Sequence, residues 1–361
     1  MEDAFQKPLP EFESIPMEAF TADTTLREDT PFGDEYLAFE VRLPEGWGSD
    51  DAQSVGNFQL SESVLGEVAR YFGPVRPGFR SYFSVQVVGM KYQLTTEQWF
   101  KLYLLENGYS IQGLDVLDDG RVEAIYVVIE NDVTYVVRAV AEVNGKRAVL
   151  AQYVMPVEQW QDEKLMQERV VGSFRLLNKD TNFIEVMKPY YFLDVAEMQY
   201  PESWALRSKP LRSVDHMDVQ LLNTVENKEH RHAAQLLNGK IEVHLFSAYS
   251  VDDLEQQIED FKHEVQGDGL LLQDIIEEPD DFDFNDNVEF ARVQVFGATD
   301  QNKSVLGYEF WFTVMAARDY YYFVTLLTPS RNDDFLNWAR NTQTFRSVNA
   351  LISPLDSAVS D

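Results

Sequence analysis

The sequence predicts an α+β protein of two tandem domains, each an antiparallel β-sheet flanked by helices in an α/β/α sandwich-like arrangement. Three observations predict this class. The order strand, helix, meander and helix occurs twice along the chain. The meander strands alternate apolar and polar residues, and Asp119-Gly120 and Asn144-Gly145 mark hairpin turns between them. The length of 361 residues suits two domains, and 45% hydrophobic residues can fill two cores.

Each half opens with an alternating strand that ends at a proline, followed three residues later by a tryptophan. The first half reads EYLAFEVRLPEGW, with Pro44 and Trp47, and the second reads YFLDVAEMQYPESW, with Pro201 and Trp204. This shared opening is the first sign of an internal repeat.

A strand that runs directly into a helix comes next in both halves. SYFSVQVVGM precedes LTTEQWFKLYLLENG, and KIEVHLFSAYS precedes VDDLEQQIEDFKHEVQG. Thr95 or Thr96 in the first half, and Ser250 with Asp253 in the second, provide side-chain oxygens that can cap the exposed amides at the helix start. Gly108 and Gly267 are typical of the ends of such helices.

Three or four further strands follow in each half, and a helix closes it. The expected strands are 109–118, 121–130, 132–143 and 146–154, then 269–276, 288–299, 305–317 and 320–328. Each last strand ends at a proline, Pro156 or Pro329, before the closing helix. The triplet Ser173-Phe174-Arg175 corresponds to Thr344-Phe345-Arg346.

These elements resemble the PsbP/Mog family of folds, including DcrB-like proteins. The resemblance rests on the Pro-aromatic strands LPEGW and YPESW and on TLLTPSRNDDFLNWARNTQTF, in which a strand ends in Thr-Pro before a helix. Met155 departs from it where the second half has Thr328, and 205–239 and 277–289 have no counterpart. The resemblance implies binding and assembly roles, as in photosystem accessory proteins, a Ran-binding factor and bacterial envelope or secretion chaperones. Fold alone does not fix function.

The domain boundaries follow from the repeat. We expect an acidic flexible tail over 1–35, a first domain over 36–180, a second over 188–352 and a flexible C-terminus over 353–361. The tail holds ten acidic and two basic residues. Its apolar residues could instead form a docking peptide for a partner. The N-terminus lacks a signal-peptide pattern, so we expect either a mature periplasmic chain, which we favour, or a cytoplasmic one.

Composition excludes several classes of protein. The chain has 61 acidic and 30 basic residues, a net charge of −31, and no cysteine. A disulfide scaffold and a Cys-ligated metal site are therefore impossible. The excess of acidic over basic residues also argues against binding phosphate backbones, so we expect no nucleic acid partner. We expect no membrane span, because charged residues interrupt every long apolar run.

Metal-ligating patterns are weak. Asp281, Asp283 and Asn285 have the i, i+2, i+4 spacing of calcium ligands, but the glycine and glutamate that complete the usual loop are missing. We interpret 277–289 as an acidic loop between two strands. His230-x-His232 is the only histidine cluster in sequence, and we interpret it as a solvated polar stretch. We expect His244, which alternates with apolar residues in a strand, to face solvent or to be a satisfied, partly buried residue.

No nucleophile, dinucleotide or phosphate-loop motif is present, so we expect no cofactor and a non-catalytic role. The sequence favours a protein-binding or assembly module whose partner has a basic surface. The resemblance implies an accessory subunit or chaperone of a bacterial envelope or secretion complex. A hydrolase with a site between the domains and a calcium-dependent binding protein are the alternatives. The candidate partner-binding residues are Phe5, Phe12, Phe20, Trp47, Trp204, Tyr320 and Tyr322.

Overall fold

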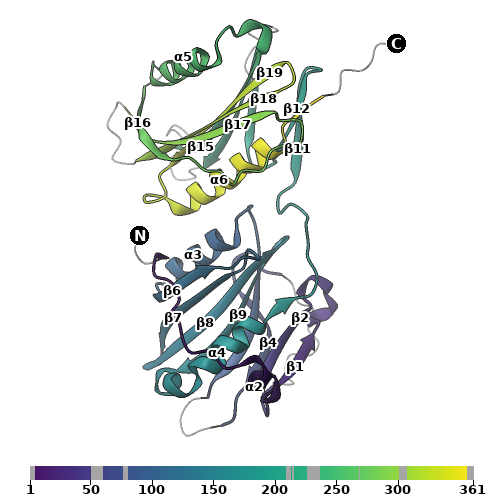
Figure 1. The fold of residues 1–361 in the computed structure, drawn as a ribbon, viewed down its shortest axis with the longest axis vertical. Coiled ribbons are helices and arrows are strands. Elements are labelled where there is room, and N and C mark those ends of the chain that lie inside the picture. The colour runs from purple at the N-terminus through teal and green to yellow at the C-terminus, as the bar shows by residue number, and fades with distance from the viewer. Residues whose placement is uncertain are drawn as a thin grey trace. The chain divides into compact units, whose positions relative to one another are not determined.

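A computed structural model describes residues 5–49, 60–75, 80–208, 213, 215–225, 236–267, 269–300 and 307–355. The chain divides into two compact units, Met1–Ile184 and Glu185–Asp361. Each unit contains a seven-stranded sheet and a three-stranded sheet (Figure 1). Every strand pair in these sheets is antiparallel.

The large sheet of unit 1 has the strand order β3-β4-β5-β9-β8-β7-β6. Its strands are β3 (Gly48–Ser49), β4 (Gly66–Phe72), β5 (Tyr82–Gly89), β6 (Ser110–Val116), β7 (Val122–Glu130), β8 (Val133–Asn144) and β9 (Arg147–Pro156). The small sheet is β1 (Thr24–Asp29), β2 (Phe39–Pro44) and β10 (Arg175–Leu176), in the order β1-β2-β10.

Two longer helices of unit 1 pack against its large sheet. Helix α3 (Thr96–Glu106) lies over β7 and β8, and helix α4 (Trp160–Ser173) lies over β8, β9 and β2. Helix α2 (Met17–Ala22) precedes β1. Short 3-10 turns complete the unit at η1 (Pro31–Gly33), η2 (Glu35–Leu37) and η4 (Val157–Gln159).

Unit 2 repeats this order of elements. Its large sheet is β13-β14-β15-β19-β18-β17-β16 and its small sheet is β11-β12-β20. The strands are β11 (Met187–Phe192), β12 (Ala196–Pro201), β13 (Ala205–Ser208), β14 (His216–Val225), β15 (Leu236–Ser247), β16 (Leu270–Glu277), β17 (Phe290–Asp300), β18 (Tyr308–Ala317), β19 (Tyr320–Pro329) and β20 (Ser353–Pro354). The helical segments are η5 (Ala248–Ser250), α5 (Leu254–Gly267) and α6 (Phe335–Ala350).

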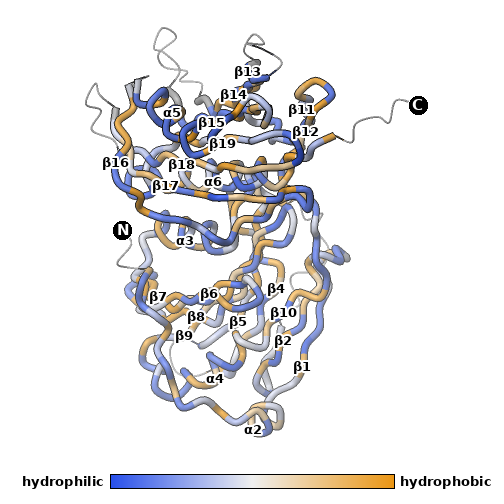
Figure 2. Tube along the Cα trace, turned by 45° about the horizontal axis from the view of Figure 1, so that its top comes forward, coloured by the Kyte–Doolittle hydropathy of each residue, from blue (hydrophilic) through white to orange (hydrophobic). Residues whose placement is uncertain are grey.

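The cores explain why the strands are apolar on both faces. In unit 1 the main core lies between the large sheet, α4 and the small sheet, and includes Phe83, Tyr153 and Phe174. In unit 2 one core faces α6 and a second, rich in phenylalanine, faces α5. Sheets covered on both sides bury side chains of either parity. In Figure 2 hydrophobic residues accordingly recur along the sheet strands.

The predicted fold class is confirmed, and several local signals are confirmed with it. Thr95 caps α3 in a capping box with Gln98, whose backbone N–H donates to the Thr95 hydroxyl at 3.1 Å. Asp253 accepts from the first backbone amides of α5. The hairpin glycines Gly120 and Gly145 have φ of 80° and 56°, values that favour glycine.

Three sequence interpretations need correction. The expected flexible tail is wrong for residues 17–29, which form α2 and β1, because pairing with β2 and burial of Phe20 order them. Segment 205–239 is not an unmatched insertion: it supplies β13, β14 and the start of β15, which hold the places of β3, β4 and β5. Ser353, placed in the C-terminal tail, pairs with β12. The remaining tail, 356–361, lies outside the described residues.

The closing triplets are also not equivalent. Phe174 follows the end of α4, whereas Phe345 lies inside α6, which continues to Ala350. The shared triplet therefore marks two different positions relative to the closing helix.

Candidate partner-binding surface

Four of the seven candidate partner-binding aromatics are core residues. Phe20 and Trp47 are buried in unit 1, and Trp204 and Tyr322 are buried in unit 2, with exposed fractions of 1%, 6%, 2% and 1%. After the turn at Pro44, the Trp47 indole packs against the large sheet, with its ring centroid 5.1 Å from that of Tyr153. Each of these side chains packs in the core of its own unit and is therefore not accessible to a partner. Tyr320 is half-buried against the unit 2 core.

The other two candidates, Phe5 and Phe12, lie on unit 1 itself. Residues 5–16, here called the N-terminal segment, run over β6, β7 and α4 (dark purple in Figure 1). Phe12 packs edge-on against Trp160 of α4 at 5.8 Å, and Lys101 of α3 lies 5.4 Å from the Phe5 ring. The Arg169 Nε donates to the Ile15 carbonyl at 2.8 Å. The apolar residues of this segment are thus engaged by the chain's own unit.

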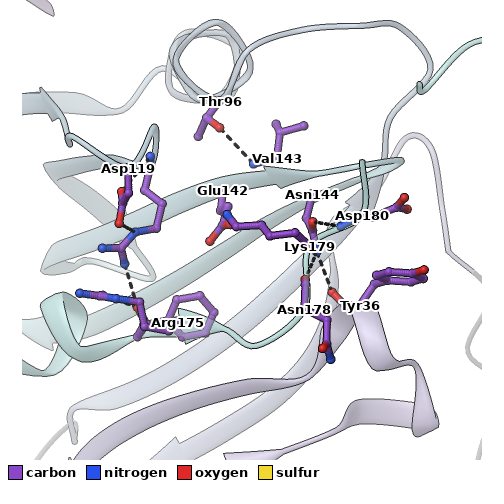
Figure 3. Close-up of polar contacts among 12 residues, drawn as sticks. Tyr36, Thr96, Asp119, Glu142, Val143, Asn144, Arg175, Asn178, Lys179 and Asp180 are labelled. Carbon is purple, nitrogen blue, oxygen red and sulfur yellow. Dashed lines mark hydrogen bonds and ion pairs between the residues drawn. The ribbon is translucent and has the colours of Figure 1, made fainter. Parts of the chain in front are cut away.

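A polar network fixes the end of unit 1 and is centred on Asn144, at the end of β8 (Figure 3). Its Nδ2 donates to the carbonyls of Tyr36 and Asn178 at 3.2 and 2.9 Å, and its Oδ1 accepts from the Asp180 backbone N–H at 2.7 Å. Lys179 pairs with the Glu142 carboxylate in the same network. Since Asn144 uses both amide donors and its oxygen, its role is to fasten the chain after β10 to the sheet.

Arg121 forms a second, separate set of polar contacts in unit 1. Its Nε donates to the Asp119 carboxylate at 2.8 Å and its Nη1 donates to the Phe174 carbonyl at 2.8 Å. Burial works against the charge of Asp119, but hydrogen bonds from the Arg121 backbone and side chain lower its pKa. Arg121 therefore joins the β6–β7 turn to the end of α4.

Glu123 in unit 1 and Glu309 in unit 2 are buried glutamates. Burial raises the pKa of Glu123, although Arg138 beside it favours the charged form. Glu309 on β18 accepts from the indole N–H groups of Trp311 and Trp338 at 3.1 and 2.8 Å. Each carboxylate accepts hydrogen bonds from donors of its own unit, which is the arrangement of a structural anchor.

Arg331 completes the Glu309 site. Its Nε lies 2.9 Å from one Glu309 carboxylate oxygen, and its Nη2 lies 2.8 Å from the Glu277 carboxylate. Burial opposes the charge of Arg331, but the hydrogen bonds to Glu309 and Glu277 raise its pKa. This cation therefore ties the end of β16 to the buried glutamate.

The acidic segment 277–289 joins β16 to β17, as expected, and it is fixed to the sheet rather than free. The Phe282 ring lies 6.3 Å from Trp311 and 5.9 Å from Phe345 in the unit 2 core. Arg346 of α6 lies over the Phe282 ring at 4.2 Å and donates to the Asp281 carboxylate at 2.9 Å. Apolar side chains hold the segment in place while most of its carboxylates face solvent.

This geometry determines the surroundings of the three residues with calcium-ligand spacing. Asp281 pairs with Arg346, and the Asn285 Oδ1 accepts from the Asn287 backbone and side-chain amides at 3.0 and 2.9 Å. Asp283 is exposed. Across the described ranges, no three His, Asp or Glu side chains converge in a way that could hold a metal ion.

The histidines are arranged differently from the sequence pattern. His230 and His232 lie outside the described residues. Instead the structure brings together His216 of β14 and His244 of β15, whose Nε2 and Nδ1 are 3.3 Å apart. His244 is buried and its ring meets that of Phe261 of α5 edge-on at 5.0 Å, which agrees with a satisfied, partly buried residue. The two histidines become neighbours because residue 216 pairs with 246 and residue 218 pairs with 244 in the antiparallel sheet. The sequence alone does not show this register, so it does not reveal the histidine pair.

Strand β16 has three exposed aliphatic side chains. Leu271, Ile275 and Ile276 have exposed fractions of 47%, 46% and 56%. β16 is the last strand of its sheet, and the acidic segment follows it directly. Residues 270–289, here called the acidic rim, contain eight carboxylates and no lysine or arginine. In Figure 2 the stretch that follows β16 is predominantly hydrophilic.

No helix in the described parts of the chain has the length and apolar character needed to cross a membrane. No protein-family model matches the sequence, and no curated protein is similar to it. Among solved structures, the cyanobacterial PsbP of Synechocystis is similar with 15% identity and a TM-score of 0.31, over 42% of this chain and 92% of that one. The T6SS immunity protein TplEi of Pseudomonas aeruginosa is similar with 8% identity and a TM-score of 0.22, over 88% and 94%. These similarities concern the fold alone.

Proposed function

We propose that this chain is a non-catalytic protein-binding module that recognises a partner with a basic surface through the acidic rim of unit 2. The observation that carries the proposal is the combination in one segment of eight carboxylates, no basic residue and three exposed aliphatic side chains. Exposed aliphatic residues beside a charged border are typical of protein interaction sites.

The fixed geometry of the rim supports recognition of a particular partner. Phe282 and Arg346 hold the acidic segment against the sheet, so little conformational freedom is lost when a partner binds. Clustered carboxylates attract basic surfaces and raise the association rate, and this attraction weakens with added salt.

The setting that we propose is an accessory subunit or chaperone of a bacterial envelope or secretion complex in the periplasm. This part of the proposal rests on the resemblance of the Pro-aromatic strands to the PsbP/Mog family.

The test compares two pairs of matched substitutions. Asp280→Asn with Asp283→Asn neutralises two exposed carboxylates of the rim, and Asp118→Asn with Asp132→Asn neutralises two exposed carboxylates of unit 1. Each immobilised variant is incubated with an extract of the native host at low and physiological salt, and the captured proteins are quantified by mass spectrometry.

We expect one protein with a basic surface to be captured by the native chain and by the unit 1 variant. Its recovery should fall about fivefold with the rim variant, because two exposed charges together contribute about 1 kcal/mol. Equal recovery by both variants, or capture that does not depend on salt, would show that the rim is not the recognition surface.

A further inference from the structure

The duplication places two equivalent edge strands at the ends of the two large sheets. β6 follows helix α3 and pairs on one side with β7, and β16 follows helix α5 and pairs on one side with β17. Each is the last strand of its sheet. An edge strand presents backbone donors and acceptors that can pair with another extended chain.

The edge of β6 is covered by the N-terminal segment. The Leu114 backbone N–H donates to the Lys7 carbonyl at 2.9 Å, and the Leu9 backbone N–H donates to the Asp115 carboxylate at 3.2 Å. Gly113 permits this approach, because a Cβ at that position would lie 2.6 Å from the Pro8 carbonyl oxygen. Unit 1 therefore uses an extended segment of its own chain as a partial additional strand.

The edge of β16 has no such cover in the part of the chain that the structure describes. β17 is the strand that pairs with it there, and Leu271 and Ile276 stay exposed along it. Among the described residues, the same position in the repeated fold is thus occupied in unit 1 and open in unit 2.

Charge decides what can occupy the open edge. The rim contributes eight negative charges and no positive one, so the same edge of a second copy would be repelled. The chain's own N-terminal segment contains two glutamates, Glu11 and Glu13, and one lysine, Lys7. Its net negative charge also makes it a poor partner for this edge. A basic extended segment fits both the carboxylates and the exposed backbone edge.

We propose that β16 pairs with an extended segment of a partner protein, which adds to the sheet of unit 2 as a further strand. The segment is basic, to match the carboxylates of the rim, and carries aliphatic residues that pack beside Leu271 and Ile276. The two register shifts between β16 and β17 twist this edge and confine pairing to a short segment. The inference rests on the proposed function, because it specifies how the acidic rim binds its partner.

The test uses the full-length chain and two synthetic octapeptides of alternating lysine and valine with blocked ends. One has a normal backbone. The other is N-methylated at two consecutive central residues, which removes one donor from each edge of the peptide and keeps its charge and side chains. Binding is measured by calorimetry, and amide exchange is followed over 270–277.

We expect the normal peptide to bind and to slow amide exchange in β16. The methylated peptide should bind at least about tenfold more weakly, because backbone hydrogen bonds carry the pairing. Ile276→Asn should weaken binding of the normal peptide, whereas Val116→Asn on the covered strand β6 should not.

The other outcomes overturn the inference in distinguishable ways. Equal binding of both peptides, with no protection of 270–277, would show that the rim captures basic chains by charge alone, and the proposed function would stand. Protection of 270–277 in the absence of peptide, together with dimerisation, would assign the edge to a second copy. Absence of binding by both peptides would remove the strand-addition inference, while the host-capture experiment would separately decide the proposed function.

Discussion

Gly113→Ala tests whether the N-terminal segment is held on β6 by close backbone contact. The added methyl group would lie 2.6 Å from the Pro8 carbonyl oxygen and 2.9 Å from the Leu9 Cα. Ordinary contact begins at about 3.4 Å, so the segment must move outward by about 0.8 Å. That movement stretches the hydrogen bond between Leu114 and Lys7 from 2.9 Å to about 3.7 Å, beyond the range of a real bond.

The expected loss follows from the contacts that this movement breaks. One neutral backbone hydrogen bond contributes about 1 kcal/mol, and the bond from Leu9 to the Asp115 carboxylate contributes about the same or slightly more. The local free energy of opening should therefore fall by about 2 kcal/mol, which corresponds to a roughly 30-fold faster exchange of the Leu114 amide.

Amide exchange measured by mass spectrometry or NMR reads this change directly, and cleavage after Glu11 by a glutamate-specific protease provides a second readout. Gly172→Ala is the matched control, because it adds the same methyl group in α4 with no heavy atom within 4 Å. Unchanged exchange at Leu114 in Gly113→Ala, or equal acceleration in the control, would refute the claim that the segment is seated on β6 through Gly113.

Three further predictions concern the cores. Glu309→Gln removes the buried negative partner of Arg331, so the free energy of unfolding in denaturant should fall by about 3 kcal/mol, and a loss below about 0.5 kcal/mol would contradict the anchoring role. Gly239→Ala places a methyl group 2.5 Å from the Asn341 amide nitrogen, so the Tm should fall by several degrees in calorimetry; an unchanged Tm would mean that this amide is not fixed. Because burial raises the pKa of Glu123, its contribution to stability is complete below the ordinary value of 4.5 and is lost as the pH rises through the raised value. The unfolding free energy of the native chain relative to Glu123→Gln should therefore fall across that window, and a constant difference from pH 4 to pH 8 would refute the assignment.

Local chemistry made most of the fold predictable from the sequence. Thr95 and Asp253 begin helices because their side chains satisfy free amides, and Gly120 and Gly145 turn hairpins because they adopt positive φ. These signals depend on neighbours within a few residues. The repeat itself was readable because Pro44 and its counterpart end equivalent strands in both halves.

The candidate site was less predictable because it depends on contacts between distant segments. Phe12 reads as an exposed aromatic in an acidic tail, and only its packing on Trp160 shows that it belongs to unit 1. His216 and His244 are far apart in sequence, and the register of β14 and β15 joins them. The exposure of Ile276 likewise depends on which strand lies last in the sheet.

The two halves share one topology, so the difference between their edges is informative about role. The same outer strand is covered by residues 7–9 in unit 1 and is bordered by eight carboxylates in unit 2. An uncovered apolar edge is an aggregation hazard that proteins suppress with charge, a cover or a bulge. Both outer strands have register shifts, but unit 1 adds a cover, whereas unit 2 adds carboxylates. These protect the edge against like-charged copies while leaving it accessible to a chain of opposite charge. Under the proposed function, the concentration of acidity at β16 both opposes pairing with a second copy and selects a basic partner.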